Sequence, residues 1–99
     1  MLSYYPECFA REMGCTEAEW LGWLPKAMGN PLLQLEAGTT KVRVGDGVLR
    51  LAWEAVEPRA IGLIRIPVLR VSFRFEAVDD QQRHAFMTRF DLYMQRGGG

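Results

Sequence analysis

The spacing of hydrophobic positions changes twice along the chain, which divides it into a helical start, an alternating middle and a helical end. At the start, Phe9 and Met13 are four positions apart, which is the spacing of one helix face. Pro6 is tolerated in a first helical turn, and Gly14 is suited to a left-handed C-cap. Residues 6–13 therefore predict a short helix.

A second helix is predicted directly after the first. Thr16 and Glu19 have the spacing of a capping box, in which two side chains satisfy backbone groups at a helix N-terminus. Pro25 is expected to bend or restart this helix, and residues 29–31 are expected to end it. The apolar side chains that crowd one side of this helix are Trp20, Leu21, Trp23 and Leu24.

From Leu32 to Val78 the period becomes alternating, and glycines and prolines punctuate the runs. This pattern predicts four strands. Residues 41–44 and 49–54 alternate on either side of Gly45-Asp46-Gly47, which predicts a hairpin. The strongest alternation places four apolar residues on one face of the last strand: Leu69, Val71, Phe73 and Phe75.

The third predicted strand, at about residues 60–66, departs from this alternation. Ile61 and Leu63 occupy one of its faces, whereas Ile64 and Ile66 occupy the other. A strand that is apolar on both sides needs cover on both sides. We therefore expect another chain to cover Ile61 and Leu63, as a homodimer or with a different protein partner.

The chain ends in a third predicted helix, capped by Asp79. Its apolar positions recur at helical spacing, namely Phe86, Phe90, Tyr93 and Met94. Short turns and the absence of strand-helix-strand alternation favour an antiparallel meander. The expected fold is therefore α+β: a four-stranded antiparallel meander with N-terminal helices and a long C-terminal helix packed on one face, forming a single domain over residues 1–99.

The composition is that of one globular domain, and the sequence shows no signal for secretion or for membrane insertion. The 99 residues are 48% hydrophobic and 24% charged, which is an ordinary balance for a folded protein. The N-terminus lacks the basic and apolar regions of a secretion signal, and no window has the length of a membrane span. We therefore expect a cytoplasmic protein without a membrane partner.

The residues that usually carry catalysis or metal binding are sparse. Cys8 and Cys15 favour two free thiols, with a disulfide as the alternative. His84 is the sole histidine and fits a solvent-facing helical position, although Asp80 one turn away could orient it as a base. No familiar catalytic or phosphate-loop motif is present. We therefore predict no catalytic residue, metal or cofactor, and lean away from an enzyme.

The formal net charge is zero, but the basic residues gather in the strand region. Seven lie from Lys41 to Arg74 against three acidic residues, a local net charge of +4. An arginine-rich sheet face could bind an anion, nucleic acid or an acidic protein, whereas pairing with Glu54 and Glu76 is the ordinary alternative. Nucleic acid lacks the support of outward aromatic residues. The candidate binding residues are Arg43, Arg50, Arg65, Arg70 and Arg74.

Both ends of the chain carry a recognisable pattern. The opening Leu2-Ser3-Tyr4-Tyr5-Pro6 and the closing Phe90-Asp91-x-Tyr93-x-Gln95-Arg96-Gly97-Gly98-Gly99 resemble a small uncharacterised family of bacterial proteins. The resemblance implies a bacterial protein and carries no activity. The three final glycines are interpreted as a helix stop, with a functional tail as the alternative.

These observations favour a binding role over catalysis. The leading expectation is a non-enzymatic module of the bacterial cytoplasm that binds another protein or assembles with itself, with Ile61 and Leu63 at the interface. The alternative is an anion or nucleic-acid binder that uses the arginine face.

Overall fold

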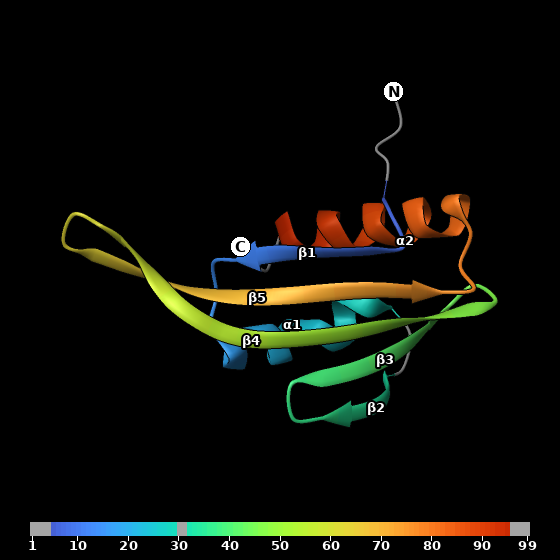
Figure 1. Cartoon of the computed structure of the whole chain (residues 1–99), viewed down its shortest axis with the longest axis horizontal. Coiled ribbons are helices and arrows are strands. Elements are labelled where there is room, and N and C mark those ends of the chain that lie inside the picture. Colours follow the sequence, from blue (N-terminus) through green and yellow to red (C-terminus); the bar gives the residue numbers. More distant parts are fainter. Residues whose placement is uncertain (1–4, 30–31, 96–99) are drawn as a thin grey trace.

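Two helices lie on one face of a five-stranded antiparallel sheet in the computed structural model, which describes residues 5–29 and 32–95 (Figure 1). The strand order is β1-β5-β4-β3-β2, and every neighbouring pair is antiparallel. The elements along the chain are β1 (Cys8–Met13), α1 (Glu17–Met28), β2 (Leu32–Glu36), β3 (Thr39–Val44), β4 (Gly47–Ile61), β5 (Ile64–Glu76) and α2 (Asp80–Tyr93).

The α+β class, the antiparallel sheet and the C-terminal helix agree with the sequence-based expectation, but the strand and helix counts do not. Over the described residues there are five strands and two helices, where four strands and three helices were expected. The predicted helix over residues 6–13 is wrong. This segment is β1, which pairs with β5 along its whole length, from Cys8 opposite Arg74 to Met13 opposite Leu69.

The spacing of Phe9 and Met13 misleads because four positions fit an even period as well as a helical one. Phe9, Arg11 and Met13 are partly buried on the helix side, whereas their neighbours along β1 are exposed. A helix this short would be only marginally stable. Forming its first turn fixes several backbone dihedral angles but makes only one hydrogen bond. Pairing with β5 instead satisfies the backbone groups on one side of the segment.

The second predicted helix is confirmed as α1. Thr16 and Glu19 form the capping box, with the Thr16 hydroxyl accepting from the Glu19 backbone N–H at 3.1 Å. The helix continues through Pro25 without the predicted restart. It ends at Gly29, whose φ of 74° lies in the left-handed region that favours glycine.

The core lies between the helices and one face of the sheet. As expected, α2 is capped by Asp79 and packs its aromatic residues on β5. The ring centroids of Phe90 and Phe73 are 5.6 Å apart and nearly perpendicular, and those of Phe86 and Phe75 are 6.1 Å apart. Trp20 of α1 completes the cluster, 6.2 Å from Phe90.

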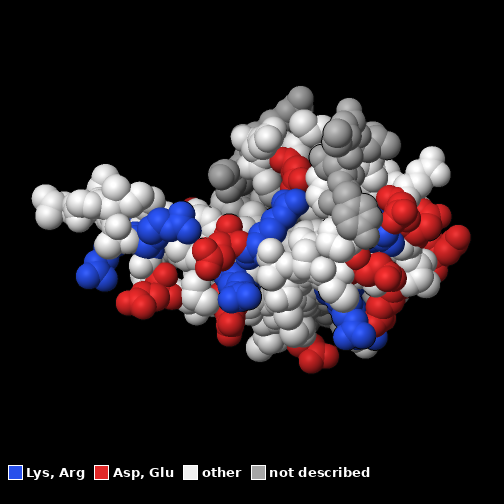
Figure 2. Space-filling view, turned by 45° about the horizontal axis from the view of Figure 1, so that its top comes forward, with Lys and Arg blue, Asp and Glu red and all other residues white. Residues whose placement is uncertain are grey.

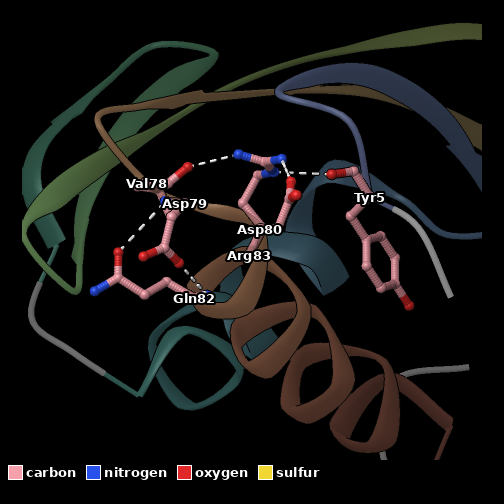
Figure 3. Close-up of polar contacts among 6 residues, drawn as sticks. All are labelled: Tyr5, Val78, Asp79, Asp80, Gln82 and Arg83. Atoms are coloured by element: carbon pink, nitrogen blue, oxygen red, sulfur yellow. Dashed lines mark hydrogen bonds and ion pairs between the residues drawn. The ribbon is translucent and has the colours of Figure 1, made fainter. Parts of the chain in front are cut away.

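A buried arginine connects α2 to the loop that precedes this helix and to the segment that precedes β1 (Figure 3). Arg83 is only 6% exposed. Its guanidinium donates to the Tyr5 carbonyl at 2.8 Å and to the Val78 carbonyl at 2.6 Å, and it pairs with Asp80. Because a buried charge without partners is costly, this set of contacts identifies Arg83 as structural.

A second polar contact joins β1 to the last turn of α2. Arg11 donates to Asp91 through both terminal nitrogens, at 2.6 and 3.3 Å, and the Tyr5 hydroxyl donates to the same carboxylate at 3.1 Å. The Arg11 guanidinium also lies 5.5 Å from the ring centroid of Phe9. These contacts hold β1 at the edge of the sheet.

Truncation of Phe90 tests the packing of α2. Phe90→Ala is expected to lower the free energy of unfolding by ~3–5 kcal/mol, because a fully buried ring is replaced by a cavity. Leu92→Ala, at a half-exposed position of the same helix, is the matched control and should change stability far less. Equal losses in the two variants, measured by urea denaturation, would contradict this placement of the helix.

Candidate functional site

The outer halves of β4 and β5 form a two-stranded arm, residues 56–68, that extends past both helices (Figure 1). Val56 pairs with Val68 at its base and Ile61 with Ile64 at its end, with a register shift between Val56 and Arg59. The arm contributes to a molecular length of 46 Å. In the space-filling view its outermost end is uncharged, with charged side chains closer to the body (Figure 2).

The end of the arm corrects the prediction for residues 60–66. This segment is not a separate third strand, because β4 runs to Ile61 and β5 begins at Ile64. Gly62 has a φ of 60°, which suits the first central position of a two-residue hairpin turn. Since the chain reverses here, Ile61 and Ile64 lie directly opposite each other and share one face.

One face of the arm carries a set of branched aliphatic side chains, which we call the apolar stripe, with Arg59 among them opposite Ile66. Alternation along β5 and direct pairing with β4 place these residues together. Exposure rises along the stripe from 7% at Val68 to 57% at Ile61 and 64% at Ile64, and Leu63 at the turn is fully exposed. The members of the apolar stripe are Val56, Ile61, Ile64, Ile66 and Val68.

Two contacts hold the arm near its base. Arg59 forms an ion pair with Glu12 of β1 at 3.4 Å. A Cβ at Gly14, in the loop after β1, would lie 3.6 Å from Cγ2 of Ile66, which places the backbone of this loop beside the stripe. Both contacts are short of the tip, so Ile61, Leu63 and Ile64 extend beyond them.

The sheet face opposite the helices forms a second candidate surface, on which charged and small residues lie in separate rows. Lys41, Arg50 and Arg74 are direct neighbours across β3, β4 and β5, and we call them the cationic row. The next row holds small or neutral side chains from four strands, which we call the neutral row: Thr39, Ala52, Ser72 and Ala10. A concavity of about 440 Å³ lies over these two rows.

Glu76 partly neutralises the cationic row. Its carboxylate accepts from Arg50 Nε at 2.9 Å and lies 3.7 Å from Arg74 Nε. The hydrogen bond from Arg50, together with the positive charges of Arg50, Arg74 and Lys41, holds the pKa of Glu76 below its usual value. The predicted pairing with Glu76 is therefore present, and it leaves three cations around one carboxylate.

The five predicted arginines do not form one patch. Arg50 and Arg74 lie together in the cationic row, whereas Arg70 lies beyond the neutral row, with Glu54 and Glu12 opposite it on the neighbouring strands. Arg43 pairs in register with Val48 on the other side of the cationic row. Arg65 lies on the arm, apart from the other four.

Sequence reasoning missed the contribution of β1 to this face. Cys8, Ala10 and Glu12 are exposed there beside Arg74, Ser72 and Arg70 of β5. The alternation of Phe9, Arg11 and Met13 with these residues was the available signal.

The remaining candidate chemistry is dispersed. Cys8 is exposed on the open face and Cys15 is buried under the helices, and both thiols are free. His84 is half-buried, with its ring centroid 6.0 Å from that of Tyr5. Within residues 5–29 and 32–95, no group of three or more histidine, cysteine or acidic side chains could hold a metal ion. The final glycines, 97–99, and the opening residues 2–4 lie outside the described part.

Comparison of the chain with protein-family models and with curated proteins finds no match in either case. None of the described helices is long and apolar enough to cross a membrane. The function is therefore argued from the arm and the open face themselves.

The two thiols should differ in reactivity. Burial, with a smaller effect from the charge of Glu19, raises the pKa of Cys15, which together with its buried position disfavours reaction of this thiol. We expect an excess of iodoacetamide to alkylate one thiol per native chain, at Cys8, and two in denaturant, as read by mass spectrometry. Cys8→Ser should leave the native chain almost unmodified. Rapid native alkylation of that variant would contradict the burial of Cys15.

Proposed function

We propose that this chain is a non-enzymatic assembly module that pairs with a second copy of itself through the arm. The observation that carries the proposal is the apolar tip: Ile61, Leu63 and Ile64 are more than half exposed on a segment that extends past both helices. Scattered exposed leucines are ordinary, but a cluster of aliphatic side chains on a projecting hairpin is typical of an interface.

Burial of the tip supplies a driving force for pairing. Each aliphatic side chain taken fully out of water contributes roughly 1.5–3 kcal/mol, scaled by the fraction exposed beforehand. Three tip side chains cannot cover the roughly 800 Å² per partner of a standard interface. The contact is therefore expected to run along the apolar stripe toward the base of the arm.

The order of charges along the arm favours a second copy as the partner. On the face that carries the apolar stripe, Glu54 lies near the base, whereas Arg59 lies nearer the tip. Two arms that pack these faces in opposite directions bring each Arg59 toward Glu54 of the other. Such a two-fold contact is isologous and closes at a dimer.

The mass of the protein in solution tests this proposal. We expect the wild-type chain to sediment as a dimer at high concentration, and Ile61→Lys with Leu63→Lys to sediment as a monomer, because burying two ammonium groups opposes the contact. Leu35→Lys with Leu92→Lys is the matched control, since both leucines are at least half exposed away from the arm. The control should remain a dimer.

Circular dichroism and thermal melting separate loss of pairing from loss of fold. The arm variant should retain the wild-type spectrum and differ only in mass. A wild-type monomer at every concentration, or a folded arm variant that is still a dimer, would overturn the proposal.

A further inference from the structure

We infer that the concavity on the open sheet face is a binding site for a small phosphate-bearing ligand, held by Lys41, Arg50 and Arg74 above the neutral row. This site is separate from the arm, and the inference does not depend on self-association. Strand pairing imposes the charge arrangement of this site on three adjacent strands.

The three cations are held close together by strand pairing. Lys41, Arg50 and Arg74 are direct cross-strand partners, and neighbouring strands are about 4.8 Å apart. Like charges directly opposite each other destabilise a sheet unless something of opposite sign compensates them. Glu76 supplies one such charge to three cations, and Glu36, which also lines the concavity, supplies a second. A bound anion would complete the compensation.

The shape of the face leaves room for that anion on one side of the cationic row. Glu76 lies on the side of Val48, which is its partner in register. On the other side, the small side chains of Ala52 and Ser72 form the floor of the concavity. Its volume, about 440 Å³, is in the range of small-molecule sites.

The donors around the concavity suit phosphate oxygens. Arg50 and Arg74 contact Glu76 through Nε, so their Nη groups can serve as further donors. The hydroxyls of Thr39 and Ser72 lie in the adjacent row and also line the concavity. Planar guanidinium groups bind phosphate through paired hydrogen bonds, which a monatomic anion such as a halide cannot accept.

Two other occupants fit less well. The arm of a second copy would bring Arg59 and Arg65 to a row that already holds three cations. Nucleic acid would gain no base stacking, because Trp53, Phe73 and Phe75 are buried on the helix side of the sheet. A compact phosphate ligand needs neither stacking nor an extended surface.

Pyrophosphate is the probe, titrated into the full chain by calorimetry at two salt concentrations. We expect saturable binding that weakens as salt rises. Arg50→Gln with Arg74→Gln should weaken it about tenfold or more, because two charge-assisted contacts are lost. Arg43→Gln with Arg65→Gln removes the same charge outside the concavity and should leave the affinity within about twofold of wild type.

A third variant distinguishes a specific site from general positive charge. Glu76→Gln removes the carboxylate that competes for Arg50 and Arg74, so it should tighten pyrophosphate binding, and amide signals of Ala52 and Ser72 should shift on titration. Weaker binding in Glu76→Gln, equal losses in the two double-arginine variants, or no saturable binding by the wild type would each overturn the inference. Tighter binding of a short RNA than of pyrophosphate would overturn it as well.

Discussion

The β4–β5 hairpin is longer than the helices that cover one of its faces, and the projecting arm follows from that mismatch. β4 has 15 residues and β5 has 13, whereas α1 has 12 and α2 has 14. A strand rises about 3.3 Å per residue and a helix only 1.5 Å, so a strand extends about twice as far as a helix of equal length. Part of the hairpin therefore extends beyond the helix layer. The apolar stripe lies on the face that the helices leave open, because Ile66 and Val68 alternate in phase with Arg70.

A second constraint is that the helices cover only one side of the sheet. Both helices pack on the face that carries Phe73, Phe75 and Trp53, where the aromatic cluster forms the core. The other face has only its own side chains, and strand register decides which of them become neighbours. Register places Lys41, Arg50 and Arg74 in one row beside a row of small residues. The small residues lie between this cationic row and the apolar arm.

Local signals in the sequence predicted the parts of the fold that depend on local interactions. The capping box at Thr16, the N-cap at Asp79, the hairpin at Gly45 and the docking of Phe86 and Phe90 are all present. The errors concern long-range pairing. β1 is a strand because it pairs with β5, and no local sequence pattern predicts this pairing. Ile61 and Ile64 share a face because the chain turns between them, which alternation alone does not reveal.

The central claim is that the arm is covered by a second copy, and amide chemical shifts as a function of protein concentration test it most directly. The account predicts that amides of residues 59–66 shift on concentration, together with a rise in rotational correlation time. The turn at Ala37 and Gly38, at the far edge of the sheet, should not shift. Arm signals that stay constant from dilute to concentrated solution would contradict the account.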